Sequence, residues 1–340
     1  MLGKLFRRRR AVGLDVGSGS VKALTLEARG SEVAVAGYGS VALEADAQAP
    51  QVSQAIHAAL AQAGADSEPV VASVGGPEVV IRQVSLPPLA PSKVIAALEM
   101  QYRELGLLPP EDSILDAQVL RRSKDGVSNE ILSVSAPKPL FEERTTLLRQ
   151  AAVNLQILDI EPLAILNGAL HLTGLEPGEL LVVVNIGRQS SVLCVYSEQG
   201  PVVARYLEVG ADAFTEQLRV AFQVSPYSAE TFARTLGAAE GPKAEAACRE
   251  VVERMAEDIR LSLTFYRTEY DRESLPRYAL GGWVEIPLIG RWLSDRLGLN
   301  APFESMDPLK AVEVKAAQEA EEGKVGTQFL QSFGLALRGL

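Results

Sequence analysis

The stretch Val12–Leu24, VGLDVGSGSVKAL, decides the fold of this chain. An apolar strand leads into Asp15, a turn of small residues follows, Gly17-Ser18-Gly19-Ser20, and Lys22 stands where a second apolar strand begins. Glycines in a turn let successive backbone N–H groups form a concave nest for an anion. Lys22 supplies a positive charge for a phosphate, and Asp15 is suited to hold a metal ion through water. The stretch is not a P-loop, because a strand rather than a helix follows the turn; a plain hairpin with a Gly/Ser turn is the alternative.

The same pattern recurs at a constant offset of 170 residues, in Val182–Gly210, VVVNIGRQSSVLCVYSEQGPVVARYLEVG. Gly17 aligns with Gly187, and Asp15 aligns with Asn185. Each copy reads strand, small-residue turn, strand, glycine-containing turn, strand. We therefore expect duplicated halves whose turns, Gly17–Lys22 and Gly187–Ser191, face each other across one cleft. The other turn residues are Arg188, Gln189 and Ser190 in the second copy, and Gly281, Gly282 and Trp283 in a third glycine turn after a later apolar strand.

These glycine turns resemble those of the actin-like ATPase superfamily, and the chain as a whole resembles its FtsA-like branch. Within that branch, the segment LPPLAP…PPEDSILDAQV and the ending GLALRG are similar to the type IV pilus assembly family PilM. The resemblance covers essentially the whole chain. It implies an α/β, actin-like fold of two domains, each a ribonuclease H-like duplicate, with an inserted subdomain of the PilM type, known as 1C.

The resemblance also implies the domain organisation. Domain I (1A) would comprise residues 1–178 and 325–340, because a last helix returns to the first domain, and it would carry the 1C-like insertion at about 87–154. Domain II (2A) would comprise residues 179–324, with a 2B-like insertion at about 211–275. Between Pro87 and Val153 the sequence predicts a helix, two strands and a second helix, which agrees with such an insertion, and Ser92 is the expected N-cap of the first helix.

A site for ATP or ADP with Mg²⁺ is the next implication of the resemblance. Asp15 would hold the Mg²⁺ through water, and the turns would hold the phosphates. Glu230 and Arg234 match a Glu/Lys pair that approaches the nucleotide ribose, although an exposed i,i+4 pair on a helix surface is the alternative. Glu161 matches an acid that positions the attacking water in some branches, which makes it the candidate catalytic residue; we favour stabilisation of this carboxylate by the helix N-terminus alone.

Two departures from the superfamily pattern concern the chemistry. Asn185 stands where an aspartate usually holds the Mg²⁺ shell, and an uncharged amide coordinates a hard cation more weakly. Trp283 replaces a small residue at a point where the backbone approaches adenine, so its indole can stack on the base or occupy the place of the base. We therefore expect at most a very slow ATPase, in which the nucleotide acts as a conformational ligand.

The composition bounds the class of protein. A length of 340 residues, 47% hydrophobic and 22% charged, predicts a folded protein of two domains. The net charge of −10 argues against a general nucleic-acid binder. Cys194 and Cys248 lie in separate segments, so no disulfide framework is indicated, and there is no Cys/His cluster for a transition metal. No apolar run approaches the ~20 residues of a membrane helix, and no signal peptide is visible, so we expect a soluble, cytoplasmic protein. The cluster Arg7–Arg10 is a solvated tail or a weak anchor to anionic lipid.

Together these observations predict an adaptor that is peripheral to the cytoplasmic face of the inner membrane. The resemblance implies that it binds the cytoplasmic N-terminal tail of a PilN-like membrane protein, and through it the pilus platform, in a groove between the first three-stranded unit and the insertion Ser92–Val153. Self-association is also possible in such a fold. The alternatives are a nucleotide-free pseudo-ATPase scaffold, an FtsA-like filament protein, a type II secretion assembly domain and, last, an actin-fold small-molecule kinase.

Overall fold

The computed structural model describes most of the chain. The described residues are 9–30, 32–44, 46–65, 67–107, 109, 111–123, 126–234, 236, 239–283, 288–315 and 326–340. Arg7 and Arg8 of the arginine cluster lie outside them, whereas Arg9 donates to the carbonyl of Leu340 and Arg10 forms an ion pair with Glu68. Within the described ranges, no helix combines the length and the apolar character that a bilayer crossing requires.

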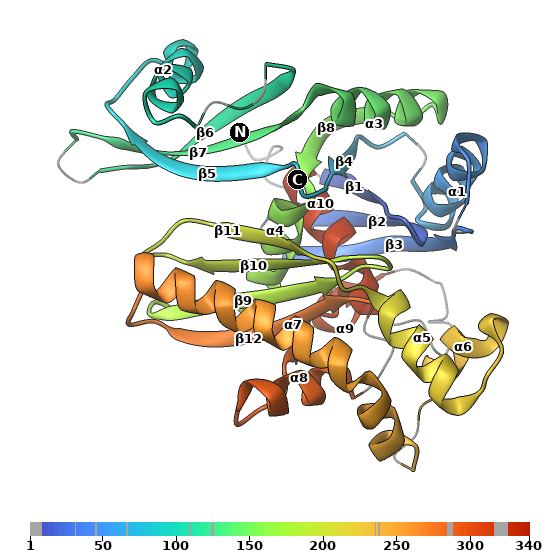
Figure 1. The fold of residues 1–340 in the computed structure, drawn as a ribbon. Coiled ribbons are helices and arrows are strands. Elements are labelled where there is room, and N and C mark those ends of the chain that lie inside the picture. Colours follow the sequence, from blue (N-terminus) through green and yellow to red (C-terminus); the bar gives the residue numbers. More distant parts are fainter. Residues whose placement is uncertain are drawn as a thin grey trace.

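The first sheet has the strand order β14-β3-β2-β1-β4-β8 (Figure 1). β1, β2 and β3 are antiparallel, whereas β4 lies parallel to β1, and β8 parallel to β4. The strands are β1 Arg9–Val16, β2 Ser20–Arg29, β3 Glu32–Ala42, β4 Val70–Val74, β8 Leu155–Ile160 and β14 Glu313–Val314. The three predicted strands of the first copy are confirmed, whereas the short edge strand β14 was not predicted.

Helices cover both faces of this sheet, because β1 and β2 bury side chains on both sides. The helix α1, Ala49–Gln62, packs Ile56 and Ala59 on Val21 and its neighbours. On the opposite face, α10, Leu330–Gly339, and the short η2, Gly326–Phe329, pack against Leu24 and Leu26. The predicted last helix therefore does return to the first sheet.

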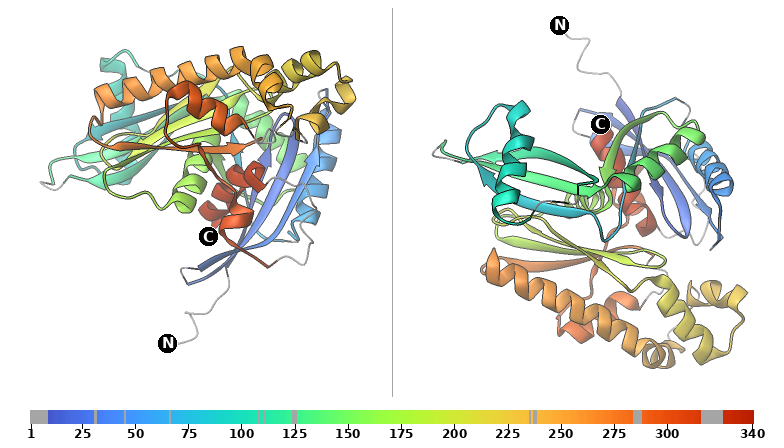
Figure 2. Two further views of the ribbon diagram at one scale, coloured as in Figure 1. Left: turned by 90° about the horizontal axis from the view of Figure 1, so that it is seen from below. Right: turned by 45° about the horizontal axis from the view of Figure 1, so that its top comes forward.

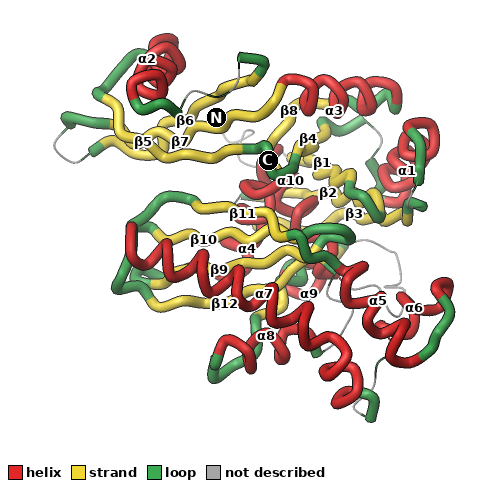
Figure 3. Tube along the Cα trace, viewed as in Figure 1, coloured by secondary structure: helices red, strands yellow, loops and turns green. Residues whose placement is uncertain are grey.

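The second sheet repeats the first, with the order β11-β10-β9-β12-β13 in place of β3-β2-β1-β4-β8. Its strands are β9 Glu179–Ile186, β10 Ser191–Ser197, β11 Val203–Leu207, β12 Leu275–Gly282 and β13 Glu304–Ser305. Its helices are α5 Ala211–Phe222, α6 Pro226–Arg234, α7 Gly241–Glu269 and α8 Ile289–Leu297. The short helix α9, Pro308–Ala311, instead packs beside η2 and β14 at the first sheet. α7 and α8 cover one face of this sheet, and α4, Glu161–Thr173, covers the other (Figure 3).

The helices α4 and α10 form a pair between the two sheets (Figure 1). Their backbones approach so closely that a Cβ at Gly334 would lie 1.8 Å from the carbonyl oxygen of Ala164. Only glycine allows this approach, so the pair joins both sheets into one body through a tight helix contact.

The insertion forms a small sheet of order β5-β7-β6, beside the first sheet and next to β11 (Figure 2). Its elements are β5 Val80–Leu86, α2 Pro91–Glu104, β6 Ser113–Arg122, β7 Asn129–Pro137 and α3 Lys138–Gln150. The elements expected in this segment are confirmed. The sequence also indicated Ser92 as the N-cap of α2, which is wrong: the helix begins at Pro91 with Ala90 as N-cap, because proline fits the first helical turn.

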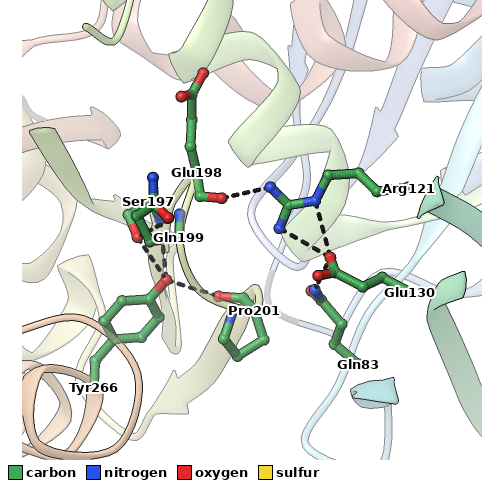
Figure 4. Close-up of polar contacts among 8 residues, drawn as sticks. All are labelled: Gln83, Arg121, Glu130, Ser197, Glu198, Gln199, Pro201 and Tyr266. Atoms are coloured by element: carbon green, nitrogen blue, oxygen red, sulfur yellow. Dashed lines mark hydrogen bonds and ion pairs between the residues drawn. The ribbon is translucent and has the colours of Figure 1, made fainter. Parts of the chain in front are cut away.

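The insertion also contacts the second half of the molecule, at the turn between β10 and β11 (Figure 4). Arg121 donates to the carbonyl oxygen of Glu198 at 2.7 Å, while Glu130 accepts from the Nε of Arg121 at 2.9 Å. From the other side, the Tyr266 hydroxyl of α7 donates to the carbonyl oxygen of Pro201 at 2.9 Å. The turn is thus held between α7 and the insertion.

Candidate functional site

A cavity of about 760 Å³ lies between the two halves. Its lining brings together most residues that the sequence predicted for a nucleotide site: Asp15, Gly17, Ser18, Gly19, Ser20, Lys22, Glu161, Asn185, Gly187, Arg188, Gln189, Ser190, Gly282 and Trp283. Gly281 is not among the lining residues. Glu230 and Arg234 belong to α6, but their side chains lie outside what the structure describes, so their approach to a ribose stays a prediction.

The two copies of the sequence pattern form the same turn in the same place. The N–H of Gly17 donates to the carbonyl oxygen of Ser20 at 3.1 Å, and the N–H of Gly187 donates to that of Ser190 at 3.0 Å. A Cβ at Gly187 would lie 2.5 Å from the Ser190 oxygen, so this turn requires glycine. The repeat in sequence is therefore a repeat in structure, and both turns open into one cavity.

Asp15 and Lys22 face each other across the β1–β2 pair. The Lys22 Nζ lies 2.8 Å from Asp15 Oδ2, and only 15% and 8% of the two side chains are exposed. Because the pair is shielded from water, the loss of either charge would leave the other buried and uncompensated. A phosphate that binds at the turn would share Lys22 with Asp15, and a hydrated cation would share Asp15 with Lys22.

Glu161 occupies the first position of α4 and lies deep in the cavity wall. Burial, and after it the charge of Asp15, raise the pKa of this carboxyl to about 7, against the opposing effect of a hydrogen bond donated by the Tyr206 hydroxyl at 3.1 Å. A Cβ at Gly75 would lie 2.0 Å from Glu161 Oε2, so the β4–β5 connection passes directly over this carboxylate, and a larger residue there would displace it. In setting the pKa of Glu161, the loss of hydration therefore outweighs the dipole at the N-terminus of α4, which favours the charged carboxylate.

Asn185, at the end of β9, carries a buried side chain in the same cavity. Its Oδ1 finds no hydrogen-bond partner among the described residues. A buried oxygen without a partner is costly, and water, a cation or a ligand donor would satisfy it. The donor set of Asp15 and Asn185 therefore fits a hydrated hard cation such as Mg²⁺, which prefers oxygen ligands and keeps several waters. No group of three or more His, Cys, Asp or Glu side chains suited to a metal occurs in the part of the chain that the structure describes.

The three residues of the third glycine turn, Gly281, Gly282 and Trp283, have different surroundings. Gly281 faces α10, because a Cβ there would lie 2.4 Å from the side chain of Leu330. Gly282 has a φ of +77°, in the left-handed region, and a Cβ there would lie 2.2 Å from the carbonyl oxygen of Ile186. Trp283 donates its N–H to that same oxygen at 2.7 Å. Its half-buried indole lines the cavity and packs against the core of the second half.

Arg188 connects the two glycine turns, Gly17–Lys22 and Gly187–Ser191. Its side chain crosses from the second turn to the first, where a Cβ at Gly19 would lie 2.6 Å from the Arg188 Cδ. Its Nη1 donates to the carbonyl oxygen of Leu43 at 3.0 Å, and its Nε lies 3.3 Å from Asp212. One side chain thus spans the cleft at the turns.

Several residues that line the cavity were not predicted from the sequence. Arg144 reaches the cavity from α3 of the insertion and donates to the carbonyl oxygen of Val16 at 2.9 Å. Tyr206 reaches it from β11, and Gln331 of α10 donates to Ser73 Oγ at 3.0 Å. Arg144 and Gln331 lie outside the motifs and the repeated pattern. Tyr206 lies within the second copy, Val182–Gly210, but the aligned residue of the first copy is Ala36, so the repeat did not indicate it.

Two duplicated sheets with matching strand order, joined by the α4–α10 pair and open to a shared cleft at their glycine turns, define the actin-like ATPase fold. The chain belongs to the family described as type IV pilus assembly protein PilM, whose family model matches residues 13–340. The predicted fold class and family are therefore confirmed.

Solved structures agree with this fold. The PilM–PilN type IV pilus biogenesis complex matches with a TM-score of 0.78 at 24% identity, over 97% of this chain and 98% of that chain. The ethanolamine utilization protein EutJ from Carboxydothermus hydrogenoformans matches with a TM-score of 0.53 at 15% identity, over 98% and 91%. A diol dehydratase-reactivating factor in nucleotide-free form matches with a TM-score of 0.51 at 10% identity, over 97% and 99%. A comparison with curated protein sequences gave no match.

Proposed function

We propose that this protein is an actin-like adaptor of the type IV pilus assembly platform, which binds the cytoplasmic N-terminal tail of a PilN-like inner-membrane protein. The observation that carries the proposal is the match of the PilM family model to residues 13–340. The similarity of the whole chain to a PilM–PilN complex supports the choice of partner. In this role the protein acts at the cytoplasmic face of the inner membrane, as a peripheral component.

The proposed partner site is the groove between the first three-stranded unit and the insertion. The sheet that contains this three-stranded unit continues through β4 to the edge strand β8, and Leu158 of β8 packs in a cluster with Ala136 and Phe141 of the insertion. Gln156, two residues earlier on the same face of β8, is exposed. An open strand edge beside a second apolar surface suits an extended peptide, which gains backbone hydrogen bonds and side-chain pockets.

A photocrosslinking amino acid at Gln156 tests this site. We expect it to capture a PilN-like tail peptide, whereas the same amino acid at exposed Glu216, on α5 of the second half, gives no product. Equal capture at both positions, or capture at Glu216 alone, would refute the groove as the partner site.

We also propose that the cleft binds ATP or ADP with Mg²⁺ and hydrolyses it little or not at all. The paired turns, Lys22 and the unsatisfied Asn185 oxygen support binding of phosphates and a hydrated cation. When bound, Mg²⁺ would neutralise phosphate charge. Asp15 and Asn185 would hold the water shell of the ion, Lys22 would bind a phosphate, and Glu161 would hold or accept a proton in the water-poor cavity wall. Because Asn185 offers no second carboxylate, the charge stabilisation that fast hydrolysis needs is incomplete.

A further inference from the structure

Arg144 is a cation of the insertion that lies in the wall of the cleft. It lines the cavity, and its Nη1 donates to the carbonyl oxygen of Val16, the residue directly before Gly17 of the first glycine turn. Among the described residues, this hydrogen bond goes to a neutral oxygen rather than to a carboxylate. No ion pair joins the guanidinium to an acidic side chain in the part of the chain that the structure describes, and the group lies beside the first turn, Gly17–Lys22.

The charges around Arg144 leave it incompletely compensated. Burial lowers the pKa of its guanidinium, and the charges of Asp15, Glu161 and Glu143 act in the opposite direction. Asp15 is already paired with Lys22 at 2.8 Å, and burial raises the pKa of Glu161 to about 7, so that acid is only partly ionised at neutral pH. A desolvated cation without a full counter-charge favours an anion at the same place.

The helix that carries Arg144 links the cleft to the insertion. Phe141, near the start of α3, packs in a cluster with Val79 and Ala136, which belong to the insertion and its entry. Leu148, near the end of α3, is buried in the core of the first sheet with Val21 and Ile56. Positions 141, 144 and 148 share one face of a helix, so Arg144 lies between the two anchors.

We propose that Arg144 binds a phosphate group of the nucleotide and thereby couples nucleotide occupancy of the cleft to the partner groove beside the insertion. The inference rests on the proposed nucleotide and partner sites. A planar guanidinium can give two parallel hydrogen bonds to one phosphate, and the Arg144 guanidinium lies on a helix that is anchored at both the first sheet and the insertion. A phosphate drawn to Arg144 acts on α3, and α3 sets how the insertion lies against the edge of the first sheet.

Calorimetry with Mg-ATP on the full chain tests the phosphate contact. Arg144→Gln removes the guanidinium, and Arg149→Gln removes an equal charge from an exposed position on the same helix, so the two variants match in net charge. We expect Arg144→Gln to weaken Mg-ATP binding roughly ten- to a hundredfold, as for loss of a hydrogen bond between charged groups. Arg144→Lys, which keeps a point charge without the fork, should lie between wild type and Arg144→Gln.

The same proteins test the coupling. With wild type and Arg149→Gln, we expect saturating Mg-ATP to change the affinity for a PilN-like tail peptide at least fivefold, within the usual range of coupling between sites. With Arg144→Gln, measured at Mg-ATP concentrations that restore saturation, the change should disappear while the peptide still binds.

The outcomes separate the inference from the proposed function. If wild type binds neither Mg-ATP nor the peptide, the proposed function is wrong and the inference falls with it. If wild type binds both, but Arg144→Gln matches Arg149→Gln in Mg-ATP affinity and in coupling, only the inference is wrong. Should Arg144→Gln fail to fold, Arg144→Lys decides: wild-type affinity and wild-type coupling in that variant would refute a role for the guanidinium fork.

Discussion

Arg188 of the second glycine turn, Gly187–Ser191, donates to the carbonyl oxygen of Leu43, at the end of the first three-stranded unit, at 3.0 Å. The two residues belong to the two duplicated halves, and the Arg188 side chain lies over Gly19 on its way across. This contact closes the cleft at the two turns. The contact between Arg121 and Glu198 lies at the other end of the β10–β11 hairpin. Opening the cleft widely requires the Arg188 contact to break.

The first prediction concerns this contact. Arg188→Ala should speed amide hydrogen exchange in Gly17–Lys22, because a hydrogen bond that resists opening is lost. Arg219→Ala is the control, since Arg219 pairs with Glu216 on the outer surface of α5 and spans no cleft. If exchange in Gly17–Lys22 stays at the wild-type rate in Arg188→Ala, the Arg188–Leu43 contact does not hold the cleft closed.

The second prediction concerns the pH dependence of stability. Glu161 has a pKa of about 7 in the folded protein against an ordinary value of 4.5. Above pH 4.5 the unfolded chain releases this proton first, so the free energy of unfolding falls between pH 4.5 and about 7 by about 3 kcal/mol and then levels off. Glu161→Gln should lack this loss. Urea unfolding from pH 4 to 8 measures the difference, with exposed Glu216→Gln as the control; a constant difference between wild type and Glu161→Gln over this range would refute the raised pKa.

The third prediction concerns the nucleotide. Mg-ATP should change the fluorescence of Trp283, whose indole lines the cavity, whereas Trp292 is buried in α8 and should not respond. Trp283→Phe should therefore abolish the signal, and Trp292→Phe should keep it. Lys22→Ala should weaken binding roughly ten- to a hundredfold, because it removes a charged hydrogen-bond donor.

Steady-state phosphate release tests the other half of that proposal. We expect release near background in wild type, because Asn185 leaves the site one carboxylate short. Brisk release that disappears in Lys22→Ala would show an enzyme rather than a nucleotide-binding adaptor.

The fourth prediction concerns the helix pair between the sheets. Gly334→Ala places a Cβ 1.8 Å from the carbonyl oxygen of Ala164, so α4 and α10 must separate, and we expect a loss of roughly 1–3 kcal/mol or more. Gly174→Ala is the matched comparison: its φ is +57°, but no atom lies within 4 Å, so only backbone strain of about 1 kcal/mol is added. Urea unfolding compares the two, and equal losses would argue against a close helix contact.

Local patterns in the sequence predicted most of the turns, strands and helices that build the two sheets. Glycine conformation predicted the small-residue turns at Gly17 and Gly187, and apolar alternation predicted the three strands of each copy. Proline placement predicted the helix α4, which begins at Glu161. All three signals act within a few residues of the chain. Similar reasoning predicted the insertion's elements. It was wrong at Ser92, where proline one residue earlier begins the helix, and it missed β14, a two-residue strand with little pattern of its own. The domain boundaries and the chemical roles of the site residues stay predictions.

Only the tertiary structure decided the electrostatics and the connections of the cleft. Arg144 meets Val16, directly before the first glycine turn, because the packing of α3 brings it there, and Tyr206 meets Glu161 because β11 and α4 lie together. The raised pKa of Glu161 and the reach of Arg188 to Leu43 have the same origin. A turn forms from interactions among neighbours in the chain, whereas desolvation and contact between distant side chains depend on how whole elements pack, and no short stretch of sequence contains that information.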